Sequence, residues 1–293
     1  MEILKSIFPT AGWEHFSFEA KLLVGRRAKS LATLLIRTIH TGCQTSILHR
    51  YMSATLRLVQ LNIEKSKHLE LVTPFLRVQE PDVVCLQELM EHDVLQIEKE
   101  LGMQCVFAPM SLEQGRSWGV GIFSRLKKTS QRAMQYGGSL DKHLLEYVHG
   151  NRREGHASSK FMLIIADIEK EGETFRIGTT HFPVTEKGEV TDFQREDMKK
   201  MLELLKEEGE FVLTGDFNAP RGGEIFAMLA KEYKDNVPPH YTTSIDGNIH
   251  RAGHLEDRMV DGIFSTPSYE IKNVTMHSGV SDHCAISAEA YKN

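Results

Sequence analysis

From residue 56 to the C-terminus, short apolar runs alternate with longer segments in which apolar residues recur three and four positions apart. The short runs are rich in Val and Ile and predict β-strands, whereas the longer segments predict amphipathic α-helices. We expect strands at 56–63, 82–89, 104–110, 120–125, 160–168, 174–182, 210–216, 258–265, 269–276 and 285–290. We expect helices at 68–79, 91–101, 192–208 and 224–233. This alternation predicts a mixed α/β domain, and two packed sheets with helices outside them fit the number of strands.

Residues 1–52 differ from the rest of the chain. They hold seven Lys/Arg against three Asp/Glu and contain helix-compatible patches, but no recognisable chemistry. One interpretation is a basic, helical N-terminal extension that packs on the domain or stays mobile. The other is that translation starts at Met52, so that the segment is not part of the native protein. Under both interpretations the main folded domain occupies residues 53–293.

The charge of the chain is unevenly distributed. The 293 residues are 41% hydrophobic and 26% charged, as expected of a globular protein. The formal net charge is −5, and because residues 1–52 carry +4, residues 53–293 carry −9. Proteins that bind long duplex DNA usually present a basic face that displaces counterions. The acidic balance therefore argues against tight, nonspecific DNA binding.

We expect neither a membrane span nor a secretory signal peptide. No apolar run approaches the roughly 20 residues needed to span a bilayer, and the run at 31–36 is not followed by a small-residue cleavage site. The four cysteines show no C-x-x-C spacing, and Cys85 and Cys284 lie inside apolar runs, which indicates buried, reduced thiols. We expect a cytoplasmic monomer.

Polar residues end the first two predicted strands. The first strand ends at Asn62, and the second ends at Gln87-Glu88. An amide at a strand end more often satisfies a turn, so Asn62 alone is a weak signal. A carboxylate that ends an apolar strand is costly to desolvate unless it is paired or binds a cation. Glu88 is therefore a candidate ligand for a hard cation: Mg²⁺ or Mn²⁺, with Ca²⁺ as an alternative.

Two later strands end in the same way. His181 ends the strand at 174–182, although a lone histidine is more often a hydrogen-bonded structural residue than a catalyst. The strand at 210–216 runs into Gly215-Asp216-Phe217-Asn218. On an extended chain, residues two apart point to the same side, so Asp216 and Asn218 are able to reach one ligand.

The last two motifs combine carboxylates with an imidazole. Asp261 lies in the run 258–265, and Ser281-Asp282-His283 precedes the final strand. Asp282 is a candidate metal ligand, whereas His283 is suited to handling a proton or the charge of a phosphoryl group. Asp261 is a candidate partner that orients His283. For any one of these acids, the alternative is a solvated loop residue.

Taken in order, these motifs resemble those of the DNase I-like endonuclease/exonuclease/phosphatase superfamily. The similarity spans roughly residues 55–291 and rests on Asn62, P-D-V-V-C-L-Q-E, T-H-F, G-D-F-N, V-D-G-I-F and S-D-H. The resemblance implies an α/β four-layer sandwich of two packed, mixed β-sheets flanked by helices. It also implies a divalent-metal-dependent phosphoesterase, most simply a nuclease or nucleotide phosphodiesterase.

The resemblance further implies roles for individual residues. Glu88 would be the principal metal ligand, with Asn62 and Asp282 completing or flanking the site. Asp216 would position or deprotonate water, Asn218 would hold a phosphate oxygen, and His283, oriented by Asp261, would act as a base or stabilise the pentacoordinate phosphorus. His181, in T-H, stands where the DNase and sphingomyelinase branches place a histidine, which shifts the expectation away from abasic-site repair.

Substrate choice is expected to reside in the loops at 115–119, 137–158 and 238–258. Arg116, Arg152, Arg153 and Arg251 are candidate phosphate contacts, and Trp118 or Tyr241 is a candidate for stacking on a base or sugar. His240, His250 and His254 surround the run 242–244 just before Asp261, so we expect this loop to border the site, although their spacing is not that of a zinc site. For the arginines a solvated surface is the more ordinary interpretation, and for the aromatic residues core packing is equally ordinary. The phosphate-ester substrate is therefore either a nucleic acid or nucleotide, or a small phosphorylated metabolite or lipid head group. A catalytically silent binding module is the third alternative.

Overall fold

The computed structural model describes residues 54–293, with the side chain of Lys187 left out, and these residues form two six-stranded sheets. Sheet A has the order β11-β12-β1-β2-β4-β3 and sheet B the order β5-β6-β7-β8-β10-β9. The strands of sheet A are β1 (Thr55–Asn62), β2 (Val83–Met90), β3 (Gln104–Glu113), β4 (Arg116–Ser124), β11 (Tyr269–His277) and β12 (Ala285–Lys292). Those of sheet B are β5 (Lys128–Gly138), β6 (Lys160–Lys170), β7 (Glu173–His181), β8 (Val212–Asp216), β9 (Lys234–Asp235) and β10 (Asp261–Ser265).

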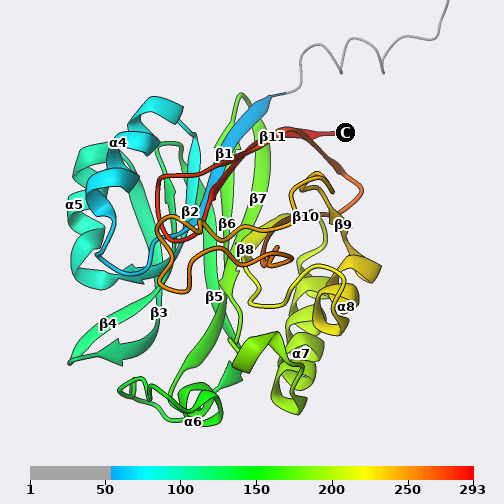
Figure 1. The fold of residues 1–293 in the computed structure, drawn as a ribbon. Coiled ribbons are helices and arrows are strands. Elements are labelled where there is room, and N and C mark those ends of the chain that lie inside the picture. The colour runs from blue at the N-terminus through cyan, green and yellow to red at the C-terminus, as the bar shows by residue number, and fades with distance from the viewer. Residues whose placement is uncertain (1–53) are drawn as a thin grey trace, which may run out of the picture. The chain divides into compact units, whose positions relative to one another are not determined.

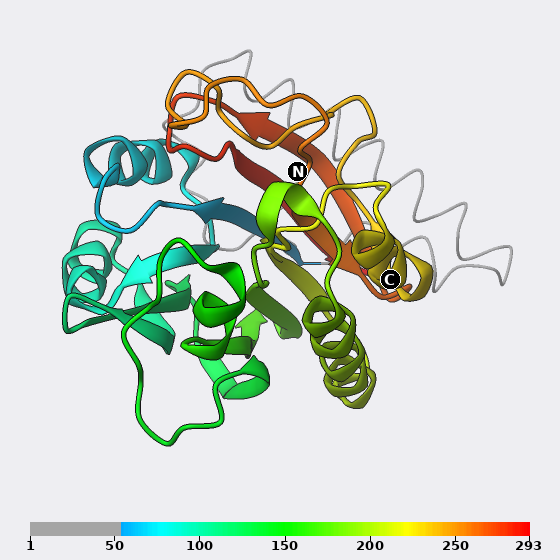
Figure 2. The ribbon, with the colours of Figure 1, turned by 60° about the horizontal axis from the view of Figure 1, so that its bottom comes forward.

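Helices cover the outer faces of both sheets. Along β1, Leu58 joins the core that contains residues of both sheets, whereas Val59 and Leu61 pack with residues of the helices α4 (Leu69–Gln79) and α5 (Val94–Leu101). The helices α7 (Asp192–Glu208) and α8 (Glu224–Glu232) lie on the side of sheet B (Figures 1 and 2). The predicted fold, a four-layer sandwich of two mixed sheets flanked by helices, is therefore confirmed.

A parallel strand pair at the centre of each sheet determines where the polar motifs meet. Strands β1 and β2 are parallel, with Asn62 beside Gln87, and β7 and β8 are parallel, with His181 beside Asp216. Strands β10 and β12 run antiparallel to β8 and β1, so they begin at the edge where the parallel pairs end. Residues at the ends of the parallel strands and at the starts of β10 and β12 are far apart in the sequence but lie at the same edge of the sheets.

The differences from the predicted elements have simple causes. Strand β5 was not predicted because it is a polar edge strand with mostly exposed or half-buried side chains. The six-residue helix α6 (Arg152–Ala157) and the two-residue β9 are too short for a periodic signal. The helix predicted at 91–101 is divided into a 3₁₀ turn, η2 (Glu91–Asp93), and α5. The last elements predicted at the C-terminus agree with β11 and β12 to within two residues.

Several other expectations concern the chain as a whole. Within residues 54–293, no helix combines the length and the apolar character needed to cross a membrane. Cys85 and Cys284 are buried free thiols, as predicted, and burial raises the pKa of each to about 12. The predicted helical extension at residues 1–52 lies outside the described residues.

Candidate functional site

Polar side chains from the two sheets meet at the edge where the parallel strands end. The Asn62 amide donates a hydrogen bond from Nδ2 to Glu88 Oε1 at 3.3 Å and another to Asp216 Oδ2 at 3.0 Å. His181 Nε2 lies 3.6 Å from Asp216 Oδ2 and 4.0 Å from Glu88 Oε1. Four of the predicted site residues, two from each sheet, therefore surround one space.

The backbone is unusual at two of these positions. Glu88 has a φ of 53° at a β-bulge in the pairing of β2 with β4, and Asn218 has a φ of 47° two residues after the end of β8. A left-handed conformation is unfavourable for a glutamate and tolerable for an asparagine, and such residues cluster at functional sites. The bulge re-aims the side chain of Glu88 at the sheet edge.

Gly215 explains why the motif needs glycine before Asp216. Its φ is 154°, and a Cβ at this position would lie 2.4 Å from the carbonyl oxygen of Thr180. A side chain would push β8 away from β7, and Asp216 would lose its place beside His181.

Asn218 and His181 fix each other's hydrogen bonds. Asn218 donates from Nδ2 to the carbonyl oxygen of Phe182 at 2.9 Å. Because a carbonyl oxygen only accepts, this contact shows which atom of the Asn218 amide is the nitrogen and which is the oxygen. The same nitrogen lies 3.0 Å from His181 Nε2, so that this ring nitrogen accepts and the neutral ring carries its hydrogen on Nδ1. The Asn218 backbone N–H donates to Asp216 Oδ1 at 2.8 Å, which aligns the acid and the amide as expected from their spacing.

Asp261 and His283 form a buried hydrogen-bonded pair. His283 Nδ1 lies 2.7 Å from Asp261 Oδ2, and His283 Nε2 lies 3.8 Å from Asp216 Oδ2. Burial lowers the pKa of His283, but the carboxylates of Asp261 and Asp216 raise it more, and the net pKa is well above the ordinary value. Burial and the charge of Asp261 raise the pKa of Asp216, against the opposing effect of His283 and His181. The imidazole between these carboxylates therefore favours its protonated form.

A second layer of hydrogen bonds holds this pair and was not predicted from the sequence. Gln60 donates from Nε2 to Asp261 Oδ1 at 2.7 Å and to Gln87 Oε1 at 2.9 Å. Gln87 in turn donates to Thr179 Oγ1 in sheet B at 2.8 Å. Gln60 could have been noticed in the sequence because it interrupts the apolar residues Val59 and Leu61, and in the structure it is fully buried. Such a group is kept inside only when it is hydrogen-bonded.

The loop at 238–258 also supports the site. Ser244 is fully buried, its Oγ accepts a hydrogen bond from Asp261 N at 3.1 Å, and its carbonyl oxygen accepts one from Cys284 N at 2.7 Å. The loop is therefore hydrogen-bonded to the backbone of Asp261 and to the backbone of Cys284, which follows His283. It borders the site, as expected from the sequence.

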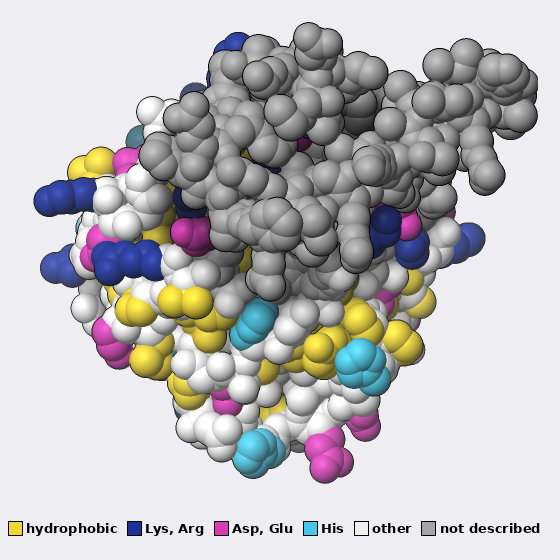
Figure 3. Space-filling model, turned by 90° about the horizontal axis from the view of Figure 1, so that it is seen from above, with side chains coloured by type: hydrophobic (Ala, Val, Ile, Leu, Met, Phe, Trp, Pro, Cys, Tyr) yellow, Lys and Arg dark blue, Asp and Glu magenta, His cyan; other side chains and the backbone are white. Residues whose placement is uncertain are grey.

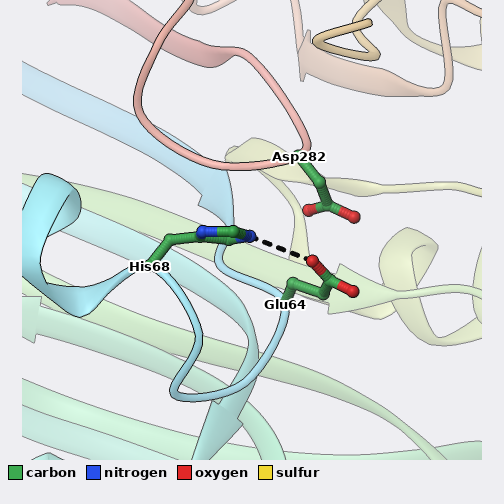
Figure 4. Close-up of side chains that lie close together, drawn as sticks. All are labelled: Glu64, His68 and Asp282. Carbon is green, nitrogen blue, oxygen red and sulfur yellow. Dashed lines mark hydrogen bonds and ion pairs between the residues drawn. The ribbon is translucent and has the colours of Figure 1, made fainter. Parts of the chain in front are cut away.

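Asp282 forms a group with Glu64 and His68 that we name the loop cluster (Figure 4). One ligand atom of each member lies within 4.8 Å of those of the others. Burial raises the pKa of Asp282, and although His283 lowers it, Glu64 and Glu88 raise it further. Two carboxylates and an imidazole at this spacing fit a divalent cation, which would relieve the repulsion between the acids.

Asn62 occupies a position between the two groups. Its Oδ1 accepts a hydrogen bond from the backbone N–H of Glu64 at 3.1 Å, while its Nδ2 faces Glu88 and Asp216. The oxygen that would bind a metal is thus hydrogen-bonded to the loop. Direct ligation by Asn62 stays a prediction, and sequence reasoning missed Glu64 and His68 because they lie in a loop and at a helix end.

The residues suggested for substrate contacts divide into two groups. Trp118 is 5% exposed and packs against His181 and Tyr147, with ring centroids 6.0 and 5.9 Å apart. Tyr241 is half-buried against the main core, so for both aromatic residues the core-packing alternative describes their position. Arg116, Arg153 and Arg251 are exposed and Arg152 is half-buried. On the part of one face visible in Figure 3, lysine and arginine side chains lie toward the left and right borders, with acidic and hydrophobic side chains near them.

Comparison with known proteins identifies the family of the chain. The model of the Endonuclease/Exonuclease/phosphatase family matches residues 59–283. No curated protein sequence matches the chain. An endonuclease/exonuclease/phosphatase from Beutenbergia cavernae DSM 12333 has a similar structure, with a TM-score of 0.63, 16% identity, and coverage of 82% of this chain and 72% of that one.

Two further solved structures have the same fold. The human Nocturnin catalytic domain with bound sulfate anion matches with a TM-score of 0.60, 16% identity, and coverage of 83% of this chain and 98% of that one. The mannosyl-6-phosphatase of Bacteroides thetaiotaomicron VPI-5482 matches with a TM-score of 0.59, 14% identity, and coverage of 80% and 99%. The family model spans most of the described residues and includes every predicted site residue. The chain belongs to the Endonuclease/Exonuclease/phosphatase family.

Proposed function

We propose that this protein is a divalent-metal-dependent phosphoesterase that hydrolyses phosphodiester bonds by in-line attack of water. The observation that carries this proposal is the buried array of Asp216, His283 and Asp261 directly beside a group of side chains that fits a cation. A phosphodiester is negatively charged and repels nucleophiles, so its hydrolysis needs positive charge and an aligned water molecule in one place.

The cation would be held by Glu88 and Asp282, with Glu64 and His68 beside Asp282 and with Asn62 fixing the loop. When bound, a divalent cation supplies Lewis acidity and neutralises charge on the phosphate. The choice of Mg²⁺ or Mn²⁺, with Ca²⁺ as an alternative, rests on the carboxylate ligands.

The residues of sheet B act on the water and the phosphate. Asp216, held through both carboxylate oxygens by Asn62 and the backbone of Asn218, positions the attacking water and accepts its proton. Asn218 donates to a phosphate oxygen, and His181, whose Nε2 accepts a hydrogen bond from the Asn218 amide in this structure, holds that amide in place. For Asn218 this requires its Nδ2 to be shared with the substrate, since it bonds to Phe182 O in this structure.

His283 stabilises the charge that develops at phosphorus. Its raised pKa favours an imidazolium, and Asp261 holds the ring so that Nε2 faces Asp216 and the site. Of the two roles predicted for His283, stabilisation of the pentacoordinate phosphorus therefore has more support than general base catalysis. No covalent intermediate with the protein is required.

For the substrate we favour a nucleic acid or nucleotide, with a small phosphorylated metabolite or lipid head group as the alternative. The net charge of −9 on residues 53–293 supports the alternative, because it opposes binding to long polyanions. The catalytically silent binding module is the least favoured, because every motif residue is present and four of them, Asn62, Glu88, His181 and Asp216, surround one space.

A substrate panel tests the proposal. The full chain is incubated with Mg²⁺ or Mn²⁺ and with plasmid, single-stranded DNA, RNA, nucleotides, inositol phosphates or sphingomyelin, and each reaction is repeated with EDTA. We expect EDTA-sensitive release of phosphate or a phosphomonoester from one class. A lack of hydrolysis in every arm, together with no metal binding by calorimetry, would leave the binding module as the better account.

A further inference from the structure

His68 adds a nitrogen to a group that otherwise offers only carboxylate oxygens. His68 Nε2 lies 3.0 Å from Glu64 Oε2, and the ring and both carboxylates point into the same space (Figure 4). The residue comes four positions after Glu64, in the loop that connects β1 to α4. Glu64 and His68 both lie in this loop and are mostly shielded, with side-chain exposures of 19% for Glu64 and 16% for His68.

The position of His68 in the helix does not explain its side chain. His68 is the N-cap of α4, where a short oxygen-bearing side chain normally accepts a hydrogen bond from the first turn. Its side chain makes no capping hydrogen bond. The ring is instead turned back toward Glu64, away from the helix that it begins.

Asp282 provides an independent indication of a ligand. It is 8% exposed, and among the described residues the one hydrogen bond to its carboxylate comes from the hydroxyl of Ser281 to Oδ1, at 3.2 Å. Its carboxylate faces Glu64 and His68 in Figure 4. A buried carboxylate with one oxygen left over and another carboxylate opposite it is unfavourable unless a cation lies between them.

We propose that His68 is a direct nitrogen ligand of the divalent cation, together with Glu64 and Asp282, and that it makes this site prefer Mn²⁺ to Mg²⁺. The proposal deepens the proposed function and rests on it for the role of the cation. Imidazole binds transition metals well, whereas Mg²⁺ strongly prefers oxygen ligands and bound water. A site with two carboxylates and one imidazole therefore discriminates between the two ions through His68.

Binding requires a change of tautomer. In the hydrogen bond to Glu64, the hydrogen on His68 Nε2 is donated to the carboxylate, whereas a ligating Nε2 must present its lone pair. The neutral ring then carries its hydrogen on Nδ1, and no other group needs to gain or lose a proton.

Mn²⁺ binding to the full chain tests the proposal without any turnover. Calorimetric titrations with Mn²⁺ and with Mg²⁺ are compared for the wild type, His68→Gln and the control His277→Gln, whose ring bonds to Ser287 on β12. We expect His68→Gln to weaken Mn²⁺ binding at least about tenfold, because even the loss of an outer partner of a ligand costs about 10- to 100-fold. Mg²⁺ affinity should change by less than about threefold, and His277→Gln should change neither.

Electron spin echo envelope modulation identifies the nitrogen. The Mn²⁺-loaded wild type should show ¹⁴N coupling from a directly bound imidazole, and the coupling should disappear in His68→Gln but persist in His250→Gln. His250 is the appropriate comparison because its charge interacts with Asp282 and Glu64. Retention of the coupling in His68→Gln, or equal loss of Mg²⁺ and Mn²⁺ affinity, would overturn the assignment. Hydrolysis without ¹⁴N coupling would reject His68 as a ligand and leave the proposed function intact.

Discussion

The two halves of the candidate site are built in different ways. The sheet-borne half consists of Gln60, Asp216 and Asp261 together with His283, which precedes β12 and is held by Asp261. The side chains of Asp216 and Asp261 are 2% and 0% exposed. The loop cluster of Glu64, His68 and Asp282 lies in connections between elements and is more open, with 19% exposure at Glu64. The first half is held by hydrogen bonds that cross from one sheet to the other.

The fold determines the geometry of the sheet-borne half, whereas a ligand would complete the geometry of the loop cluster. In the sheet-borne half, nearly every polar atom has a partner within the protein, so removing one partner disturbs its neighbours. In the loop cluster, carboxylates oppose one another and a cation would complete the arrangement. Changes in the first half should therefore affect catalysis and stability, whereas changes in the second should affect metal binding with little loss of fold.

The largest effect is expected from His283→Gln. The variant removes the imidazolium that faces Asp216 and leaves Asp261 with a neutral partner. We therefore expect kcat for a phosphodiester to fall about 10³-fold, which is the effect of losing one preorganised group that stabilises charge. Steady-state kinetics with bis(4-nitrophenyl) phosphate measures the change, with His277→Gln as the matched control. A loss of less than about threefold in a folded variant would remove His283 from the reaction.

Gln60→Leu tests whether the sheet-borne half is a single hydrogen-bonded unit. The substitution leaves Asp261 Oδ1 and Gln87 Oε1 without their donor, and each unsatisfied buried group costs about 1–3 kcal/mol. We expect a loss of about 2–3 kcal/mol in the free energy of unfolding, measured by urea denaturation, together with a smaller loss of kcat than in His283→Gln. Unchanged stability would mean that the two sheets are not coupled through this amide.

Metal removal should have a moderate effect that depends on the loop cluster. At ten times its Kd, Mn²⁺ should stabilise the wild type by about 1.4 kcal/mol over the EDTA-treated protein, because it binds only the folded state. Differential scanning calorimetry should show this as a rise in Tm. In Asp282→Asn the rise should largely disappear while the metal-free Tm stays near that of the wild type. An equal rise in both proteins would place the cation elsewhere.

The smallest effect is expected from Ser66→Ala. Ser66 donates from Oγ to Asp93 Oδ2 at 2.5 Å and so ties the loop that carries Glu64 to η2. Without this bond the loop is freer, and we expect Mn²⁺ affinity in calorimetric titrations to fall by about threefold with little change in Tm. A large fall in Tm would show that this loop belongs to the stable frame rather than to the ligand-dependent half.

The contrast between the two halves also explains which residues were predictable from the sequence. Buried strands give a strong apolar signal, so the polar residues that end them, such as Asn62, Glu88, His181 and Asp216, stand out in the sequence as members of one edge. Gln60 was overlooked because it lies in the middle of a strand, where a buried amide interrupts the apolar pattern without marking a strand end.

The loop cluster was less predictable for a physical reason. Glu64 and His68 meet Asp282 only because two loops approach each other, and short-range periodicity contains no information about that approach. The same limit applies to β5 and α6, where exposed polar side chains or a length of six residues leave no periodic signal.

The most direct test of the proposed mechanism is the hydrolysis of bis(4-nitrophenyl) phosphate by the full chain with Mn²⁺, comparing the wild type with Asp216→Asn. This substitution keeps the shape of the residue that we propose positions the attacking water, and Asp192→Asn is a control because the Asp192 side chain is 95% exposed. We predict EDTA-sensitive hydrolysis by the wild type and the control, and a rate at least about 10³-fold lower in a folded Asp216→Asn variant. Full activity in Asp216→Asn would contradict the mechanism.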